Sequence, residues 1–134
     1  MTTPPTLAQR AIACKGWHWL PGAKGEDPAS ILGPYRFDDD VRPYRFALGP
    51  RDERTTDARD LLPDLTDPAT LGCLLRLVRE AWGDPGAYTH RVDGSYAPAP
   101  VGSWWCHCVT DSDVGGFNAA TEAEALVAAL EAAP

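Results

Sequence analysis

Basic residues are scarce in this sequence: twelve Lys and Arg against nineteen Asp and Glu give its 134 residues a formal net charge of −7. Proteins that neutralise nucleic-acid phosphates need an excess of Lys and Arg, so the charge argues against that class. No apolar run approaches the ~20 residues of a membrane helix. The first five residues lack the basic start and apolar core of a signal peptide. We therefore expect a cytoplasmic protein.

Metal-binding motifs are also missing. Four cysteines are present, and we expect them to be reduced thiols in a cytosol. Cys106, His107 and Cys108 are adjacent, but structural zinc sites use C-x2-C or wider pairs, and no second pair exists. On a strand, Cys106 and Cys108 share one face while His107 points away. The sequence therefore predicts buried structural thiols, no metal site and no cofactor.

Catalytic motifs are missing as well. The glycine spacings of phosphate-binding loops are absent, and Gly115-Gly116 is predicted to be a turn. The histidines, His18, His90 and His107, are scattered, and we expect surface or core positions for them. No strained turn or oxyanion site accompanies any cysteine, as nucleophilic catalysis requires. We therefore expect a protein that is not an enzyme.

Three helices are predicted. The clearest covers 67–83, where Asp67 can cap the first turn, Pro68 follows it, and Gly83 can end the helix in a left-handed conformation. Its Leu, Val and Trp residues recur at helical spacing and form an apolar stripe. A helix from Thr121 onward begins with the capping box TEAE. A shorter helix is predicted over 7–14.

Several strands are predicted between these helices. Alternation of tryptophans favours a strand within 15–22, and the repeated tripeptides at 35–37 and 44–46 favour a loose hairpin. Further strands are predicted over 87–92, 103–110 and 117–119. In the segment 103–110, Trp104, Cys106 and Cys108 would occupy one face, and Trp105, His107 and Val109 the other.

The predicted order is α-β(β)-α-β-β-α, an α+β protein. Three amphipathic helices do not easily share one face of a small sheet, so we expect a three-layer helix/sheet/helix sandwich around a mostly antiparallel sheet. At this length, one domain over 1–134 is expected. Residues 23–64 are its least regular part, and about 23–61 is predicted to be a variable charged insertion, with an exposed loop over 51–60.

Acidic residues concentrate between positions 26 and 67, which hold eleven of the nineteen acids. Loops carry variable interaction surfaces, so this segment is our first candidate for partner binding. The predicted partner-binding residues are Glu26, Asp27, Asp38, Asp39, Asp40, Asp52 and Glu53. The simpler interpretation, which is the commoner one for acidic proteins, is that the charges only keep the protein soluble. Residues 38–40 lack the spaced oxygen ligands of a calcium loop, which favours a solvated turn.

Aromatic residues offer a second candidate. Adjacent tryptophans on one strand face opposite sides of a sheet, so a face that no helix covers would be a binding site. Core packing accounts for most of these rings. The alternative ligand-binding residues are Tyr35, Arg36, Tyr44, Arg45, Trp104 and Trp105, with rings for a nucleotide base and Arg36, Arg42 and Arg45 for its phosphates.

Three segments carry a family resemblance: ACKGWHWLPG at 13–22, LPDLTDPATLGCLL at 62–75 with VREAW at 78–82, and TEAEALVAAL at 121–130. Together they resemble the small bacteriophage and prophage proteins with a phage ABA sandwich domain. The resemblance fades over 23–61. It implies a three-layer helix/sheet/helix fold and a phage gene product acting in the cytoplasm of an infected bacterium. It implies no catalytic or binding residues.

From these features we expect an anti-defence, anti-CRISPR-like protein that inhibits a bacterial immune component by non-catalytic binding. The acids would meet a basic surface of a host defence protein, without direct contact to nucleic acid or membrane. One alternative is a sponge that sequesters a nucleotide immune signal, and another is a phage accessory protein without a defence role. An edge strand near Tyr35 or Tyr44 could also pair two copies as a homodimer.

Overall fold

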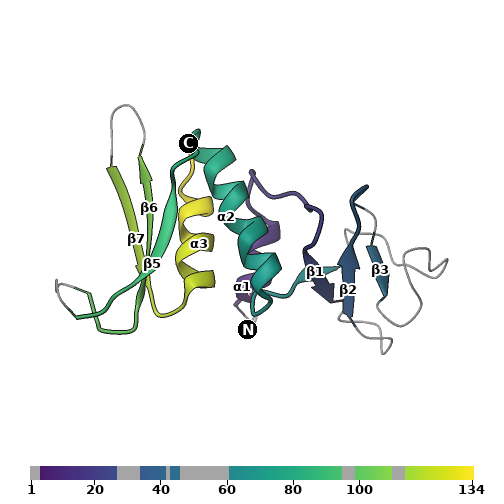
Figure 1. Cartoon of the computed structure of the whole chain (residues 1–134), viewed down its shortest axis with the longest axis horizontal. Helices are drawn as coiled ribbons and strands as arrows, with labels where there is room; N and C mark the ends of the chain where they lie inside the picture. Colours follow the sequence, from purple (N-terminus) through teal and green to yellow (C-terminus); the bar gives the residue numbers. More distant parts are fainter. Residues whose placement is uncertain (1–3, 27–33, 42, 46–60, 95–98, 110–113) are drawn as a thin grey trace. The chain divides into compact units, whose positions relative to one another are not determined.

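The computed structural model describes residues 4–26, 34–41, 43–45, 61–94, 99–109 and 114–134 (Figure 1). Its three helices and seven strands over these residues form an α+β fold with two antiparallel sheets. The predicted α+β class and antiparallel pairing are therefore confirmed, and the strands form two sheets where the sequence suggested one. Among these residues, no helix has the length and apolar character needed to cross a membrane.

Contacts within the chain group it into two compact units. The first unit comprises Met1–Ile12 with His18–Cys73, and the second comprises Ala13–Trp17 with Leu74–Pro134. Both units are discontinuous in sequence, and the expectation of a single domain over 1–134 stays a prediction.

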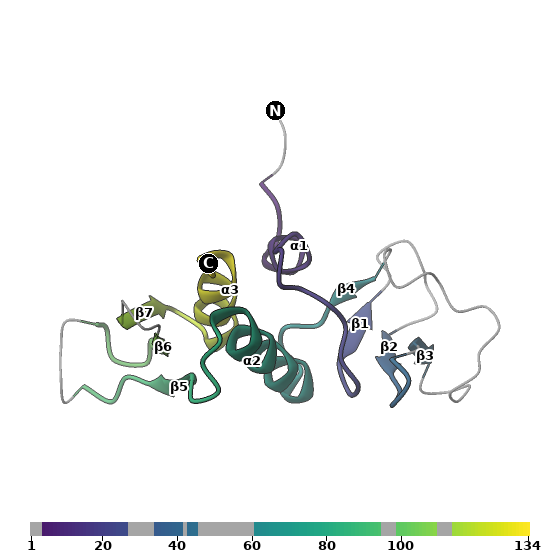
Figure 2. The same cartoon turned by 90° about the horizontal axis from the view of Figure 1, so that it is seen from above.

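The first unit contains α1 (Leu7–Ile12) and a four-stranded sheet. Its strands are β1 (Lys24–Glu26), β2 (Pro34–Phe37), β3 (Pro43–Arg45) and β4 (Leu62–Pro63), in the order β3-β2-β1-β4 (Figure 2). The predicted hairpin is confirmed, because β2 pairs with β3 and Tyr35 lies opposite Arg45. Pro43 lies on the edge strand of the described sheet, where a missing N–H is tolerated.

The core of the first unit is small and aromatic. Ala23, Tyr35, Phe37 and Leu61 are each at most 2% exposed, and Trp19 packs against them. The Trp19 and Phe37 rings stack with their centroids 4.2 Å apart.

The strand expected within 15–22 is absent from this described segment, so that prediction is wrong. The Trp17 amide donates to the Cys14 carbonyl at 3.0 Å, and the Ala23 amide donates to the Leu20 carbonyl at 3.2 Å. These bonds close turns at either end of the segment. Trp19 is placed by stacking on Phe37, a contact that needs no ladder pairing.

The hydroxyl of Tyr35 is buried and has no hydrogen-bond partner among the described residues. An unsatisfied buried hydroxyl costs roughly 1–3 kcal/mol, whereas an apolar ring of the same shape does not. We expect Tyr35→Phe to raise the free energy of unfolding by about 1 kcal/mol, measured by urea denaturation. Phe37→Leu, which removes ring packing without affecting a hydroxyl, should lower it. A lower free energy of unfolding for Tyr35→Phe would contradict the conclusion that the Tyr35 hydroxyl has no hydrogen-bond partner.

Helix α2 (Pro68–Trp82) begins and ends as its sequence predicts. The Asp67 carboxylate accepts hydrogen bonds from the Thr70 amide at 3.0 Å and from the Thr70 hydroxyl at 2.9 Å. Gly83 follows the helix at φ +65°, a conformation that favours glycine. The Thr70 hydroxyl oxygen also accepts a bond from the Lys24 amide at 2.8 Å, which ties the start of α2 to β1.

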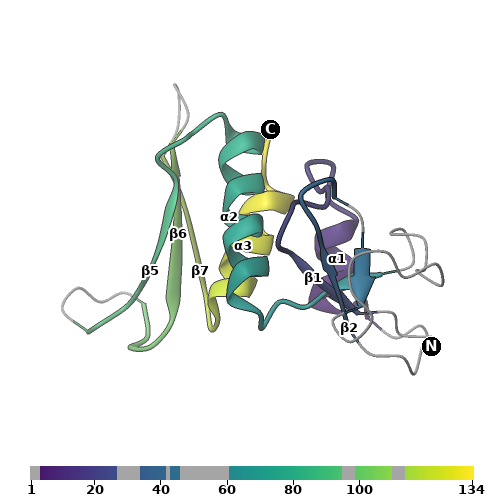
Figure 3. The same cartoon turned by 45° about the vertical axis from the view of Figure 1, so that its right-hand side comes forward.

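The second unit contains a three-stranded antiparallel sheet and α3 (Glu122–Glu131). Its strands are β5 (Tyr88–Arg91), β6 (Trp104–Val109) and β7 (Val114–Ala119), in the order β5-β6-β7. The predicted N-cap is confirmed, because the Glu124 amide donates to the Thr121 hydroxyl at 3.1 Å. Helix α3 packs against one face of this sheet (Figure 3).

Candidate binding surface on the β5–β6–β7 sheet

The predicted acidic residues do not form one described cluster. Glu26 pairs with Pro34 at one end of the β1–β2 ladder, whereas residues 38–40 follow β2 at its other end. Asp39 and Asp40 are exposed, and Asp38 accepts a bond from the Asp40 amide at 3.0 Å, which shapes the turn. Asp27, Asp52 and Glu53 lie outside the described residues, as does the predicted loop at 51–60.

Two of the alternative ligand residues are used inside the first unit. Tyr35 is fully buried, so it is a core residue and offers no ring to a nucleotide base. Arg36 forms a bidentate pair with Asp67, at 3.2 and 3.0 Å, and also donates to the Gly22 carbonyl. Its guanidinium therefore holds the start of α2. Tyr44 and Arg45 lie on β3, and Arg42 lies outside the described residues.

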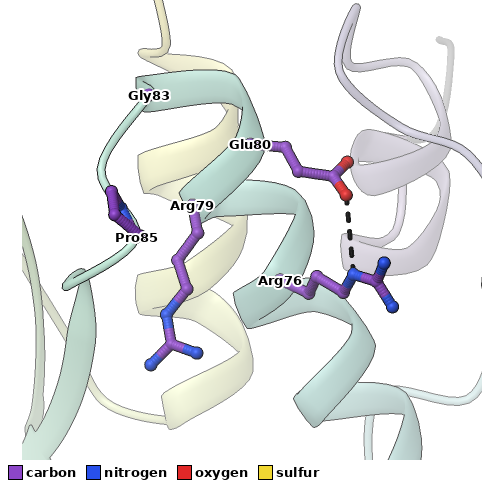
Figure 4. Close-up of a pocket in the computed structure, with 5 residues that line it drawn as sticks. All are labelled: Arg76, Arg79, Glu80, Gly83 and Pro85. Atoms are coloured by element: carbon purple, nitrogen blue, oxygen red, sulfur yellow. Dashed lines mark ion pairs between the residues drawn. The ribbon is translucent and has the colours of Figure 1, made fainter.

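A hollow of about 580 Å³ lies beside the end of α2 (Figure 4), lined by Arg76, Arg79, Glu80, Gly83 and Pro85. The Nε atom of Arg76 lies 3.5 Å from the Glu80 carboxylate, and that of Arg79 donates to the Ala87 carbonyl at 2.8 Å. Figure 4 shows the two guanidinium groups pointing apart. Because both guanidinium groups already have partners and point in different directions, we expect this hollow to bind anions weakly.

The two faces of the β5–β6–β7 sheet differ sharply. Cys106 and Cys108 are fully buried on the face that α3 covers, and Thr89 of that face donates to the Glu122 carboxylate at 2.9 Å. His107 and Val109 alternate with the cysteines, as the sequence predicts, and Val109 is 51% exposed. Figures 1 and 3 show the helices of this unit on one side of the sheet, and among the unit's described residues no helix covers the second face, which we call the open face.

Four rings lie side by side on the open face: Tyr88 and His90 from β5, and Trp105 and His107 from β6. The register places Tyr88 opposite His107 and His90 opposite Trp105. The His107 ring centroid is 4.9 Å from that of Tyr88 and 5.9 Å from that of Trp105. Trp105 also lies over Gly116, where a Cβ would approach its ring to 3.1 Å. The ring cluster is therefore held by packing along the sheet.

The two imidazoles of this cluster contact each other directly. Their Nε2 atoms are 2.8 Å apart, their ring centroids are 4.9 Å apart, and their planes differ by 8°. Such a contact needs one Nε2–H donor and one Nε2 acceptor, so the two rings carry different tautomers when both are neutral. Burial and the neighbouring His90 both lower the pKa of His107. The His107 ring is therefore biased toward its uncharged form.

Sequence reasoning treated these histidines as unrelated, because they lie seventeen positions apart. Their contact depends on the register of β5 against β6. The structure fixes that register next to the strands, where the Val92 amide donates to the Ser103 carbonyl at 2.8 Å. Counting outward from that pair along two antiparallel strands places residues 88, 90, 105 and 107 on one face.

The covered face holds two thiols that should be inert. Burial raises the pKa of Cys106 to about 12 and also raises that of Cys108. A shift of that size leaves Cys106 with roughly a thousandfold smaller thiolate fraction than an ordinary thiol. We expect iodoacetamide to modify Cys14 and Cys73, which are half-buried, while Cys106 and Cys108 react only after unfolding. Peptide mass spectrometry would check this, and rapid native alkylation of Cys106 would contradict its burial.

Comparison with known protein families, with curated proteins and with solved structures finds no match for this chain.

Proposed function

We propose that this chain is a non-catalytic inhibitor that binds a component of a bacterial immune system through the open face of its β5–β6–β7 sheet. The observation that carries the binding surface is the cluster of Tyr88, His90, Trp105 and His107 on a face that lacks a covering helix among the described residues of its unit. The immune target and the phage origin rest on the family resemblance.

The chemistry of the open face suits a protein partner. Trp and Tyr are enriched among the residues that dominate binding energy at protein interfaces, because they bury large areas with few rotatable bonds. Tyr88 is 50% exposed, so its ring can be buried further by a partner. The net charge of −7 disfavours polyanions and favours a basic protein surface, such as the one that a nucleic-acid-handling immune complex presents.

The acidic turn at 38–40 supplies a second, electrostatic contribution in this proposal. Asp39 and Asp40 are exposed there, and such charges speed association with a basic surface more than they increase affinity. We expect charge reversal at Asp38, Asp39 and Asp40 to weaken binding and to reduce its dependence on salt. Affinity that is unchanged at low and high salt would show that this turn makes no electrostatic contribution to binding.

Capture from a bacterial lysate tests the proposal. Tagged wild-type chain should retain a stoichiometric protein with a basic surface, and Tyr88→Ala or Trp105→Ser should reduce its recovery by roughly tenfold or more. That expectation follows from the ~2 kcal/mol or more that an aromatic hot spot contributes to binding. Val101→Ser is the matched control, because Val101 is 74% exposed in the same unit but lies outside the open face.

Two results would contradict the proposal. Equal recovery with Tyr88→Ala, Trp105→Ser and Val101→Ser would exclude the open face as the binding surface. A captured partner whose immune activity is unaffected by the chain would support the accessory role in place of inhibition. Circular dichroism of each variant separates lost binding from lost folding.

A nucleotide sponge is the second candidate, because accessible rings on a sheet can also stack on bases. Trp105 provides the direct readout. Concentration-dependent quenching of tryptophan fluorescence by nucleotides, absent in Trp105→Phe, would favour this candidate. A nucleotide released on heating, with no captured protein, would do the same.

A further inference from the structure

We propose that His90 and His107 together form a binding site for a divalent transition metal on the open face. Imidazole nitrogens are ligands for Zn²⁺, Ni²⁺ and Cu²⁺, and they bind zinc at about 2.0–2.1 Å. When two imidazole nitrogens bind one ion with a nitrogen–metal–nitrogen angle of about 90–109°, the two nitrogens lie about 2.9–3.4 Å apart. The Nε2 atoms of His90 and His107 are already 2.8 Å apart, and metal binding requires each ring to turn until both Nε2 lone pairs point at one ion.

The surroundings prepare both rings for this role. The His107 ring is flanked by Tyr88 and Trp105, and the His90 ring lies 6.0 Å from Tyr88 between centroids. Packing on both strands limits the side-chain entropy that is lost when the two ligands converge.

The proton balance of binding is simple. In the free neutral pair, one ring carries its proton on Nε2 and donates it to the other. When the ion binds both Nε2 atoms, the ring that was the hydrogen-bond donor changes to the Nδ1–H tautomer. It loses its Nε2 proton to solvent and takes up a proton from solvent at Nδ1. No net proton is released from the neutral pair.

The protein supplies two ligands, and solvent completes the coordination sphere. Within the part of the chain that the structure describes, no group of three or more His, Cys, Asp or Glu residues could hold an ion. The site therefore remains open to a further ligand, and a side chain from a bound partner could fill it. The metal proposal does not depend on the proposed function, because it concerns the free chain.

Calorimetric titration with Zn²⁺ and with Ni²⁺ tests the site. Thiols are also ligands for these ions, and Cys14 and Cys73 are only half-buried, so the titration uses a Cys14→Ser, Cys73→Ser background. We expect one ion per chain. We also expect His90→Asn and His107→Asn each to weaken binding more than about tenfold, since even the partners of metal ligands contribute 10–100-fold to affinity.

His18→Asn is the matched control, because His18 is exposed in the other unit and should leave binding unchanged. Nuclear magnetic resonance of the imidazole nitrogens gives a second readout, since Zn²⁺ should shift the Nε2 signals of His90 and His107 and leave His18 unmoved. No binding by the background protein, or equal binding by His90→Asn, His107→Asn and His18→Asn, would overturn the proposal. Either result would mean that His90 and His107 form a hydrogen bond and no metal site.

Discussion

Replacing Asp67 with asparagine should lower the free energy of unfolding by about 1–2 kcal/mol at neutral pH. The Asp67 carboxylate accepts two bonds from Arg36 and two from Thr70. Hydrogen bonding by Arg36, then by Thr70, lowers the pKa of Asp67 to about 2. A shift from an unfolded value near 3.9 corresponds to about 2.6 kcal/mol at most, and partial exposure reduces it. Because asparagine can still cap the helix, the decrease in the free energy of unfolding measures the contribution of the Asp67 charge.

The pH dependence of this difference has a defined sign. Because the folded pKa of Asp67 is below its unfolded value, the stabilisation is complete above about pH 4 and is lost as the pH falls toward 2. Urea denaturation between pH 3 and pH 7 should show that the difference in free energy of unfolding between wild type and Asp67→Asn becomes smaller as the pH falls. Asp39→Asn is the control, because Asp39 is exposed at a turn and should show no such difference. A difference that is constant with pH would contradict the Arg36 pairing.

Substitutions at two neighbouring positions on β6 should lower the free energy of unfolding by very different amounts. Cys106→Asp places a carboxylate on a fully buried position beneath α3, and an unpaired buried charge costs several kcal/mol. We expect it to lower the free energy of unfolding by more than about 3 kcal/mol or to prevent folding. His107→Asp changes the next residue, which is half-buried on the open face, and should cost less than about 2 kcal/mol.

Thermal and urea unfolding of both variants provide the measurement. Cys108→Asp should behave like Cys106→Asp, since Cys108 is also fully buried. The pattern depends on the alternation of side chains along one strand. Equal destabilisation by Cys106→Asp and His107→Asp would mean that both faces of the sheet are covered, and it would remove the physical basis of the open face.

Local signals in the sequence predicted the helices well. The bounds of α2 follow from Asp67, Pro68 and Gly83, and the start of α3 follows from Thr121, because caps act over three or four residues. The alternation of faces along β6 was likewise readable from six consecutive residues. A single sequence therefore predicts interactions between residues of the same helical turn or the same strand.

Non-local pairing was not readable. Strands β1 and β4 have three and two residues and include Gly25 and Pro63, so they carry no alternating pattern. Their existence depends on partners far along the chain, and Leu62 pairs with Glu26 across thirty-five intervening residues. The burial of Tyr35 and the contact between His90 and His107 have the same origin, since both depend on which strands become neighbours.

The most direct test of the open face is protection of its histidines by a captured partner. Diethyl pyrocarbonate modifies accessible imidazoles, and peptide mass spectrometry reports each site separately. In the free chain we expect His18 and His90 to be modified, and His107 more slowly, because it is half-buried. In the complex we predict that His90 and His107 are protected while His18 reacts as before. Unchanged modification of His90 and His107 in the complex would contradict recognition through this face.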